Sequence, residues 1–179
     1  MTPVTPKHAV TEADVREDAQ THGRRDAQTH TRTVALGADH GGLPLKEHLK
    51  GMLAESGYEV LDLGTYDGQA VDYPDFAVAV ARAVAEGRAW RGIMIDGAGI
   101  GSAMAANKIA GVRAALCYDL TTARSAREHN DANVLTLGGT LIGTRLAVDI
   151  ARTFISAAFG GGRHAKRVEK INALDAGRG

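Results

Sequence analysis

The fold is decided by residues 33–42, whose sequence is TVALGADHGG. The first six are a short apolar run that predicts a buried strand, and the last four place an acid, a histidine and two glycines directly after it. Leu45, Leu49 and Leu53 then recur at helical spacing, and Gly57 predicts the end of this helix. A buried strand that leads into an amphipathic helix is typical of a parallel α/β unit.

The same alternation continues along the chain. Further strands are predicted over 59–63, 93–95, 112–117 and 134–137, and further helices over about 74–87, 103–108, 146–155 and 166–173. Strands that alternate with helices are joined by right-handed crossovers, which produce a parallel sheet covered on both faces. Because ligands bind such sheets at the carboxyl ends of the strands, we expect the functional residues just after each strand.

The composition narrows the class of protein. Of 179 residues, 44% are hydrophobic and 4% aromatic, and 21 Lys and Arg balance 21 Asp and Glu. This balance gives no electrostatic case for nucleic acid or a membrane surface as a partner. The single cysteine, Cys117, excludes an internal disulfide and favours a reducing compartment. With no long apolar run and no signal peptide, the sequence predicts a cytoplasmic protein.

Residues 1–32 differ from the rest of the chain. They hold few branched aliphatic residues, and the sequence DAQTH occurs at 18–22 and again at 26–30. Such a segment buries too little apolar area to offset the entropy of ordering, so we interpret it as a mobile extension of a domain at 33–179. The alternative is a peptide that docks on a shell or partner protein, since some enzymes of bacterial microcompartments carry a tail of this general kind. We expect its removal to leave folding and activity intact.

Two groups of residues follow predicted strands in the first half of the domain. Asp39 and His40 follow the first strand, and they either cap and flank the next helix or bind the hydroxyls of a polar ligand. Residues 96–102, DGAGIGS, follow the third strand. A glycine-rich turn that enters a helix presents N–H groups to a phosphate or an oxyanion. The spacing is neither the dinucleotide fingerprint nor the Walker loop.

Two further groups lie in the second half. His129 and Asn130 come just before the fifth strand, where Asn130 either caps a helix or contacts a ligand. Arg163 and Arg167 are four residues apart, so they share one face of the last helix. They form either a solvated basic face or a guanidinium clamp for a phosphate. No group of residues has convincing metal-ligand spacing, and we expect neither a metal nor a cofactor.

Taken together, these motifs are much more specific than any one of them. In order, they are 37–42 (GADHGG), 72–74 (DYP), 97–101 (GAGIG), 106–108 (ANK), 127–130 (REHN) and 161–164 (GGRH). From about 33 to 175 the chain resembles the type B ribose-5-phosphate isomerases and is similar to the galactose-6-phosphate isomerase subunits. The resemblance implies a Rossmann-like three-layer α/β/α sandwich with a five-stranded parallel sheet. It also implies a metal-free aldose–ketose isomerase of a sugar phosphate, assembled as a homodimer or dimer of dimers with its sites at the dimer interface.

The resemblance also implies roles for single residues. Asp39 and His40 would contact the ring oxygen and hydroxyls of the sugar. His129 would assist ring opening, and Asn130 would bind a hydroxyl or the intermediate. The other implied residues are Gly97, Gly99 and Gly101, whose amides stabilise the enediolate; Arg163 and Arg167, which bind the phosphate with help from Arg113; and Tyr73, which lines the pocket.

The chain departs from the family pattern at the catalytic base. One branch of the family has Cys where this chain has Asp96, and another has Glu where this chain has Ser102. Three alternatives follow: Asp96 is the base, the substrate is another sugar phosphate such as galactose 6-phosphate, or the chain is a binding or regulatory subunit with no activity alone. We take Asp96 as the candidate base for a reaction through an enediolate, because a carboxylate is a competent base if water is excluded. The alternative is that Asp96 merely caps the following helix.

Overall fold

The computed structural model describes residues 32–177, so the predicted extension lies almost wholly outside the described residues. Within this range strands and helices alternate as predicted. The strands are β1 (Thr33–Ala38), β2 (Glu59–Asp62), β3 (Arg91–Asp96), β4 (Ala114–Leu116) and β5 (Val134–Gly138). The helices are α2 (Leu43–Glu55), α3 (Tyr73–Ala85), α4 (Ile100–Ala106), α5 (Leu120–Asn130), α6 (Thr144–Ser156) and α7 (Ala165–Asn172), with 3-10 turns at Gly162–His164 and Ala173–Gly177. Among residues 32–177, no helix combines the length and the apolar character needed to cross a membrane.

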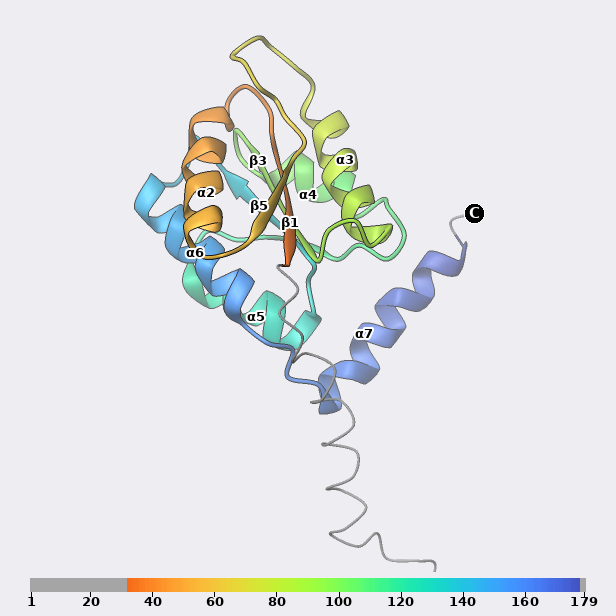
Figure 1. Ribbon diagram of the computed structural model, residues 1–179. Helices are drawn as coiled ribbons and strands as arrows, with labels where there is room; N and C mark the ends of the chain where they lie inside the picture. The colour runs from red at the N-terminus through yellow and green to blue at the C-terminus, as the bar shows by residue number, and fades with distance from the viewer. Residues whose placement is uncertain (1–31, 178–179) are drawn as a thin grey trace, which may run out of the picture. The chain divides into compact units, whose positions relative to one another are not determined.

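All five strands run parallel in one sheet, in the order β2-β1-β3-β5-β4. The helices α2, α5 and α6 pack on one face of the sheet, and α3 and α4 pack on the other (Figure 1). The predicted three-layer α/β/α sandwich with a five-stranded parallel sheet is therefore confirmed.

Successive residues of β1 enter two different cores. Val34 and Leu36 face the core beneath α2, α5 and α6, whereas Ala35 faces the core beneath α3 and α4. All three are fully buried, as expected for a strand covered on both sides. Gly37 brings α3 close to the sheet, because a Cβ there would lie 2.8 Å from the side chain of Val80. Packing on both faces leaves the strand ends as the places where polar side chains can gather.

The chain reverses direction across the sheet between β1 and β3. The strand β2 lies on one side of β1 and β3 on the other, so the carboxyl ends of β1 and β3 border the topological switch point. The Asp39 amide donates to the Ile95 carbonyl at 3.1 Å, which ties these two strand ends together. The first residues after β1 and β3 therefore share one crevice.

The helix α5 was not predicted as an element. Asp119 begins it by accepting from the Thr122 amide at 2.8 Å, and it ends at Asp131, whose backbone is left-handed (φ 46°). The C-cap is thus Asp131 and not Asn130. Only small residues of α5 and one arginine, Arg127, are buried, so the apolar periodicity that reveals other helices is missing.

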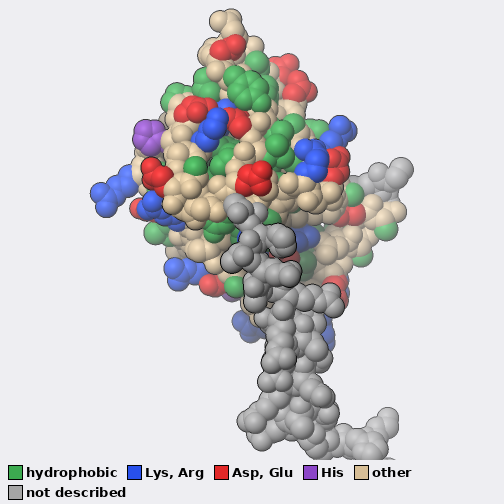
Figure 2. Space-filling view, in the orientation of Figure 1, with side chains coloured by type: hydrophobic (Ala, Val, Ile, Leu, Met, Phe, Trp, Pro, Cys, Tyr) green, Lys and Arg blue, Asp and Glu red, His purple; other side chains and the backbone are tan. Residues whose placement is uncertain are grey.

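The surface mixes both signs of charge. Figure 2 shows Lys and Arg side chains interspersed with Asp and Glu, with hydrophobic side chains between them, over the face that it presents. On this face the charge is spread out and does not form one patch.

Candidate active site

One group of predicted site residues meets at the carboxyl ends of β1 and β3. We call Asp39, His40, Tyr73, Asp96 and the loop Gly97–Gly101 the C-terminal-edge group. A Cβ at Gly41 would lie 3.4 Å from Asp39 Oδ1 and 3.9 Å from the Gly97 nitrogen, which shows how close the first strand end is to the glycine loop. The Tyr73 ring packs against Gly101, where a Cβ would lie 2.5 Å from the phenol. The structure therefore brings these residues together, as the sequence predicts.

Asp39 is nearly buried, with 8% of its surface exposed. Its Oδ1 accepts from the Gly42 amide at 2.9 Å, just where α2 begins. This bond fixes the carboxylate just before α2, but it does not cap the helix, which has no side-chain cap. It leaves the second oxygen, Oδ2, with no hydrogen-bond donor among residues 32–177.

His40 is exposed beside Asp39. Its Nδ1 accepts from the Val71 amide at 3.3 Å. A ring nitrogen that accepts leaves the proton on the other nitrogen, so Nε2 carries the N–H when the ring is neutral. His40 therefore presents a donor, which suits a sugar hydroxyl or the ring oxygen.

The Asp96 carboxylate, 4% exposed, turns inward and binds its own loop. Oδ1 accepts from the Ala98 amide at 2.9 Å and from the Gly99 amide, and Oδ2 accepts from the Ser102 amide at 3.0 Å and from the Ser102 hydroxyl. A carboxylate has about four lone-pair positions, and these donors occupy all of them. This arrangement supports the capping alternative for Asp96.

Gly99 and Gly97 of the loop differ in the space around them. Gly99 has φ 79°, and a Cβ there would meet Leu116 at 2.6 Å, so both its backbone and its packing require glycine. At Gly97 a Cβ would meet only Thr140, at 3.9 Å. The Thr140 hydroxyl fixes the loop by donating to the Gly97 carbonyl at 2.6 Å. The space over Gly97 is thus open to a ligand.

A second group lies at the end of α5 and the start of α7. We call His129, Asn130, His164 and Arg167 the N-terminal-edge group, because α5 ends just before β5 begins. With two apolar residues of α7 they line a pocket of about 310 Å³. The rings of His129 and His164 stack with centroids 4.4 Å apart and an interplanar angle of 12°. Two imidazoles and a guanidinium around one pocket suit an anionic group.

His164 belongs to the motif GGRH, but no pattern in the sequence indicated it as a candidate site residue. Partial desolvation, the facing His129 ring and the two arginines lower the pKa of His164. Arg163 is exposed and acts on His164 through its charge, but it does not line the pocket as Arg167 does. The two arginines therefore have different surroundings.

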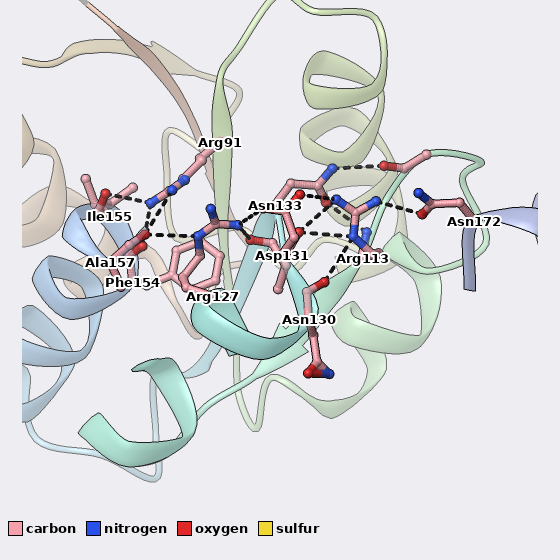
Figure 3. A network of polar contacts seen from close by, with 12 residues as sticks. Arg91, Arg113, Arg127, Asn130, Asp131, Asn133, Phe154, Ile155, Ala157 and Asn172 are labelled. Atoms are coloured by element: carbon pink, nitrogen blue, oxygen red, sulfur yellow. Dashed lines mark hydrogen bonds and ion pairs between the residues drawn. The ribbon is translucent and has the colours of Figure 1, made fainter. Parts of the chain in front are cut away.

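Arg113 is held inside the protein. Its guanidinium donates to the Asp131 carboxylate at 3.1 Å, to the carbonyls of Asn130 and Asp131, and to the Asn172 side chain of α7 at 2.9 Å. Figure 3 shows this guanidinium directed at Asp131, while the Asn130 side chain points away from the network. The structure thus does not group Arg113 with Arg163 and Arg167, and its bonds hold the ends of α5 and α7.

Two buried arginines complete this network. Arg127 donates to Asp131 Oδ1 at 2.8 Å and to the Ala132 carbonyl. Arg91 donates to carbonyls at the end of α6, and burial together with the charge of Arg127 lowers its pKa to about 9. Buried guanidinium groups that saturate backbone carbonyls build a rigid base for the residues above them. The alternation of predicted strands and helices did not indicate that these two arginines are buried.

The two groups lie at opposite edges of the sheet. Asp96 pairs with Gly138, and Gly92 pairs with Val134, just after α5. The strands span about 13 Å between these two pairs, since a strand rises about 3.3 Å per residue. The residues of the first group thus follow the carboxyl ends of strands, whereas His129 and Asn130 of the second group lie before the amino end of β5. One copy of the chain does not bring His129 to Asp96.

The cysteine and the possible metal ligands also bear on the chemistry. Cys117 is buried, and burial raises the pKa of its thiol to about 11. A thiol that ionises so late is a poor base or nucleophile near neutral pH. Among residues 32–177, no three His, Cys, Asp or Glu side chains are placed to hold a metal ion.

The family is shown by comparison with known proteins. The Ribose/Galactose Isomerase family matches residues 34–171. Ribose-5-phosphate isomerase B of Escherichia coli is 44% identical over 144 residues, which cover 80% of this chain and 97% of that protein. D-erythrulose-4-phosphate isomerase of Pectobacterium atrosepticum is 41% identical over 141 residues, covering 78% and 92%. The structure of ribose-5-phosphate isomerase B of Clostridium thermocellum is 49% identical, with a TM-score of 0.79 over 80% of this chain and 97% of that one. The chain belongs to the Ribose/Galactose Isomerase family.

Proposed function

We propose that the protein interconverts an aldose phosphate and a ketose phosphate, most simply ribose 5-phosphate and ribulose 5-phosphate. Membership of the family and the names of the relatives support this assignment. Such a reaction opens the sugar ring, moves a proton between carbons 1 and 2, and stabilises negative charge on oxygen. We propose that it takes place in the cytoplasm, where the lone cysteine stays reduced.

The N-terminal-edge pocket is the observation that carries the proposal. Its stacked His129 and His164 rings and its guanidinium from Arg167 offer several donors to one anion. A phosphate bound there supplies remote binding energy, which holds the reacting carbons in place. Arg163 adds charge from the rim, and Asn130 lies beside the pocket to contact a hydroxyl or the intermediate.

The C-terminal-edge group would hold the reacting end of the sugar. His40 presents an N–H to the ring oxygen or a hydroxyl, and Tyr73 lines the crevice. The amides of Gly97 and Gly101 donate to no residue in 32–177, so they remain to stabilise the enediolate. The Gly99 amide is already bound to Asp96, so this loop offers two of the three predicted glycine donors.

A homodimer would unite the two groups. The carbon chain of a pentose phosphate is too short to bridge the sheet of one copy. The helix α7 stands out from the sandwich in Figure 1, and Ile171 and Leu174 are 43% and 67% exposed on it and on the turn after it. We propose that the N-terminal-edge group of one copy faces the C-terminal-edge group of the other. A dimer of dimers and a docking role for the extension remain predictions, the latter for residues outside the described range.

The test is turnover of a panel of sugar phosphates by the purified chain alone. The panel holds ribose 5-phosphate, galactose 6-phosphate, D-erythrulose 4-phosphate and unphosphorylated ribose. We expect the fastest isomerisation with ribose 5-phosphate and none with ribose. Binding without turnover of any member would instead favour a sugar-phosphate-binding or regulatory subunit. Preference for the four-carbon sugar would keep the reaction class and change the substrate.

A further inference from the structure

The proposed function requires a group that takes a proton from carbon, and the inference here rests on that function. Asp96 stands where the family places one of its bases. Its oxygens, however, already accept from two amides on one side and from the amide and hydroxyl of Ser102 on the other. A base needs a lone pair directed at the substrate, and each of these is directed at the protein. Asp96 thus fixes the loop and has no position left for a substrate proton.

The neighbouring groups do not replace it. The Ser102 hydroxyl is fully buried and donates to Asp96. The Tyr118 hydroxyl donates to the Ala98 carbonyl at 2.7 Å. His40 accepts at Nδ1 from the Val71 amide, so its exposed nitrogen carries a proton and donates. Each of these groups is committed to a bond that a base would have to give up.

We propose that Asp39 is the base that moves the proton between carbons 1 and 2. Its Oδ1 is fixed by the Gly42 amide at 2.9 Å, and no residue in 32–177 donates to its Oδ2. With only 8% of its surface exposed, this carboxylate is shielded from the water that would weaken it as a base. It is anchored by one oxygen and available through the other.

The Asp39 carboxylate lies close to the glycine loop whose amides would stabilise the enediolate. The Asp39 carboxylate and the glycine loop come close together at Gly41, where a Cβ would lie 3.4 Å from Oδ1 and 3.9 Å from the Gly97 nitrogen. The space over Gly97 itself is open, because a Cβ there would meet only Thr140, at 3.9 Å. A sugar carbon in this space has a carboxylate on one side. The Gly97 amide, which donates to no residue in 32–177, would then be available to the carbonyl oxygen as it gains charge.

The proton transfer is balanced within the site. From the ketose, Oδ2 of Asp39 removes a proton from carbon 1, and the C–H electron pair becomes the double bond between carbons 1 and 2. The carbonyl electrons move to the oxygen on carbon 2, which gives an enediolate. The protonated Asp39 then returns its proton to carbon 2, the oxygen on carbon 1 becomes the carbonyl, and one hydroxyl proton moves between the two oxygens.

The experiment starts from ribulose 5-phosphate, because its 5-oxygen carries the phosphate and the ketone therefore cannot close a five-membered ring. Turnover in this direction needs no ring opening, so it isolates the proton transfer. Asp39→Asn keeps the acceptor for Gly42 and removes the basicity. We expect kcat to fall at least about 100-fold, while the Kd for ribulose 5-phosphate, measured by calorimetry, changes less than about threefold.

Asp149→Asn is the matched control, since it removes a carboxylate from α6, outside both groups of site residues. We expect it to keep more than about a tenth of wild-type kcat. The proposal is overturned if folded Asp39→Asn keeps more than a tenth of kcat, or if folded Asp149→Asn loses as much. Should Asp39→Asn not fold, Asp39→Ser repeats the test, because its hydroxyl also accepts from the helix start. A wild-type chain that isomerises no sugar phosphate would instead contradict the proposed function.

Discussion

The two edges of the sheet are built alike and charged differently. Beneath the N-terminal-edge group, Arg127 and Asp131 form an ion pair at 2.8 Å. Beside the C-terminal-edge group, the buried Lys46 binds Asp62 and the Thr65 carbonyl, both at 2.8 Å. Each edge thus has a framework of ion pairs and, beside it, polar groups that the framework does not use. At the N-terminal edge these remaining groups are imidazoles and guanidinium groups. At the C-terminal edge they are a carboxylate and amides.

This difference teaches how the site divides its work. Guanidinium groups bind a phosphate but cannot remove a proton from carbon, whereas a shielded carboxylate with nearby amides can do so. An arginine that belongs to the framework and one that belongs to the ligand site look the same in the sequence. Arg113 and Arg167 differ only in what the fold places around them.

The largest effect is expected from breaking the framework of the N-terminal edge. Arg127→Leu leaves Asp131 and the Ala132 carbonyl without their donor, and the arginine is 5% exposed. We expect the free energy of unfolding to fall by about 3 kcal/mol in urea denaturation. Arg124→Leu, on the exposed side of the same helix, is the control and should change it by less than about 0.5 kcal/mol. Equal effects would show that Arg127 does not support this edge.

A smaller effect separates the two ligand-facing arginines. Losing one charge-assisted pair to a phosphate costs about 1.5–3 kcal/mol, so Arg167→Ala should raise the KM for ribose 5-phosphate by about 10–150-fold with little change in kcat. Arg163→Ala should raise it less, because Arg163 does not line the pocket. Steady-state kinetics checks both variants. The interpretation of these arginines as a phosphate clamp is contradicted if the wild-type enzyme uses unphosphorylated ribose as well as ribose 5-phosphate.

The smallest effect concerns the framework of the C-terminal edge and appears as a pH dependence. Burial raises the pKa of Asp62, but hydrogen bonds from Lys46 and Lys50 lower it more, so the net pKa is lowered. A carboxyl group whose pKa is lower in the folded than in the unfolded chain stabilises the fold at pH values above its unfolded pKa of about 4. This stabilisation is lost as the pH falls through the pKa of the folded state. Asp62→Asn should therefore have a lower Tm than wild type at pH 7.

Thermal melts between pH 7 and pH 2 check this prediction. The difference in Tm between wild type and Asp62→Asn should shrink only below about pH 4. Glu86→Gln is the control, since Glu86 pairs with Arg88 on the exposed surface and such pairs contribute little to the free energy of unfolding. A difference that does not change with pH would show that the charge of Asp62 adds nothing to this edge.

Much of the fold could be predicted from the sequence, because it depends on patterns that are local. The apolar runs of β1 and β3 and the spacing of Leu45, Leu49 and Leu53 mark the elements. The helix α5 was not predicted because alanines and a buried arginine cover its inner face, so the sequence shows no strong apolar periodicity there. Where a helix is buried by small residues, apolar spacing gives no signal.

The candidate site residues could be identified from the sequence, but their positions relative to one another could not. The motifs identified Asp39 and Asp96 together, yet only the fold shows that one carboxylate is saturated and the other half free. The position of His129 at the opposite edge follows from the order of strands and helices, which motif spacing does not encode. Tertiary partners decide the role of a charged side chain, and they come from elements distant in the sequence.

The central claim is that the two edges act together through two copies of the chain. Asp39→Asn impairs one edge and Arg167→Ala the other, so each variant alone should be nearly inactive at low substrate concentration. When the two are mixed and their subunits exchange, each mixed dimer of two-fold symmetry contains one site with both edges intact. We predict that activity returns to about a quarter of the wild-type value, since about half of the dimers are mixed and each has one of two sites intact. No recovery of activity in a mixture shown to contain mixed dimers would contradict the account.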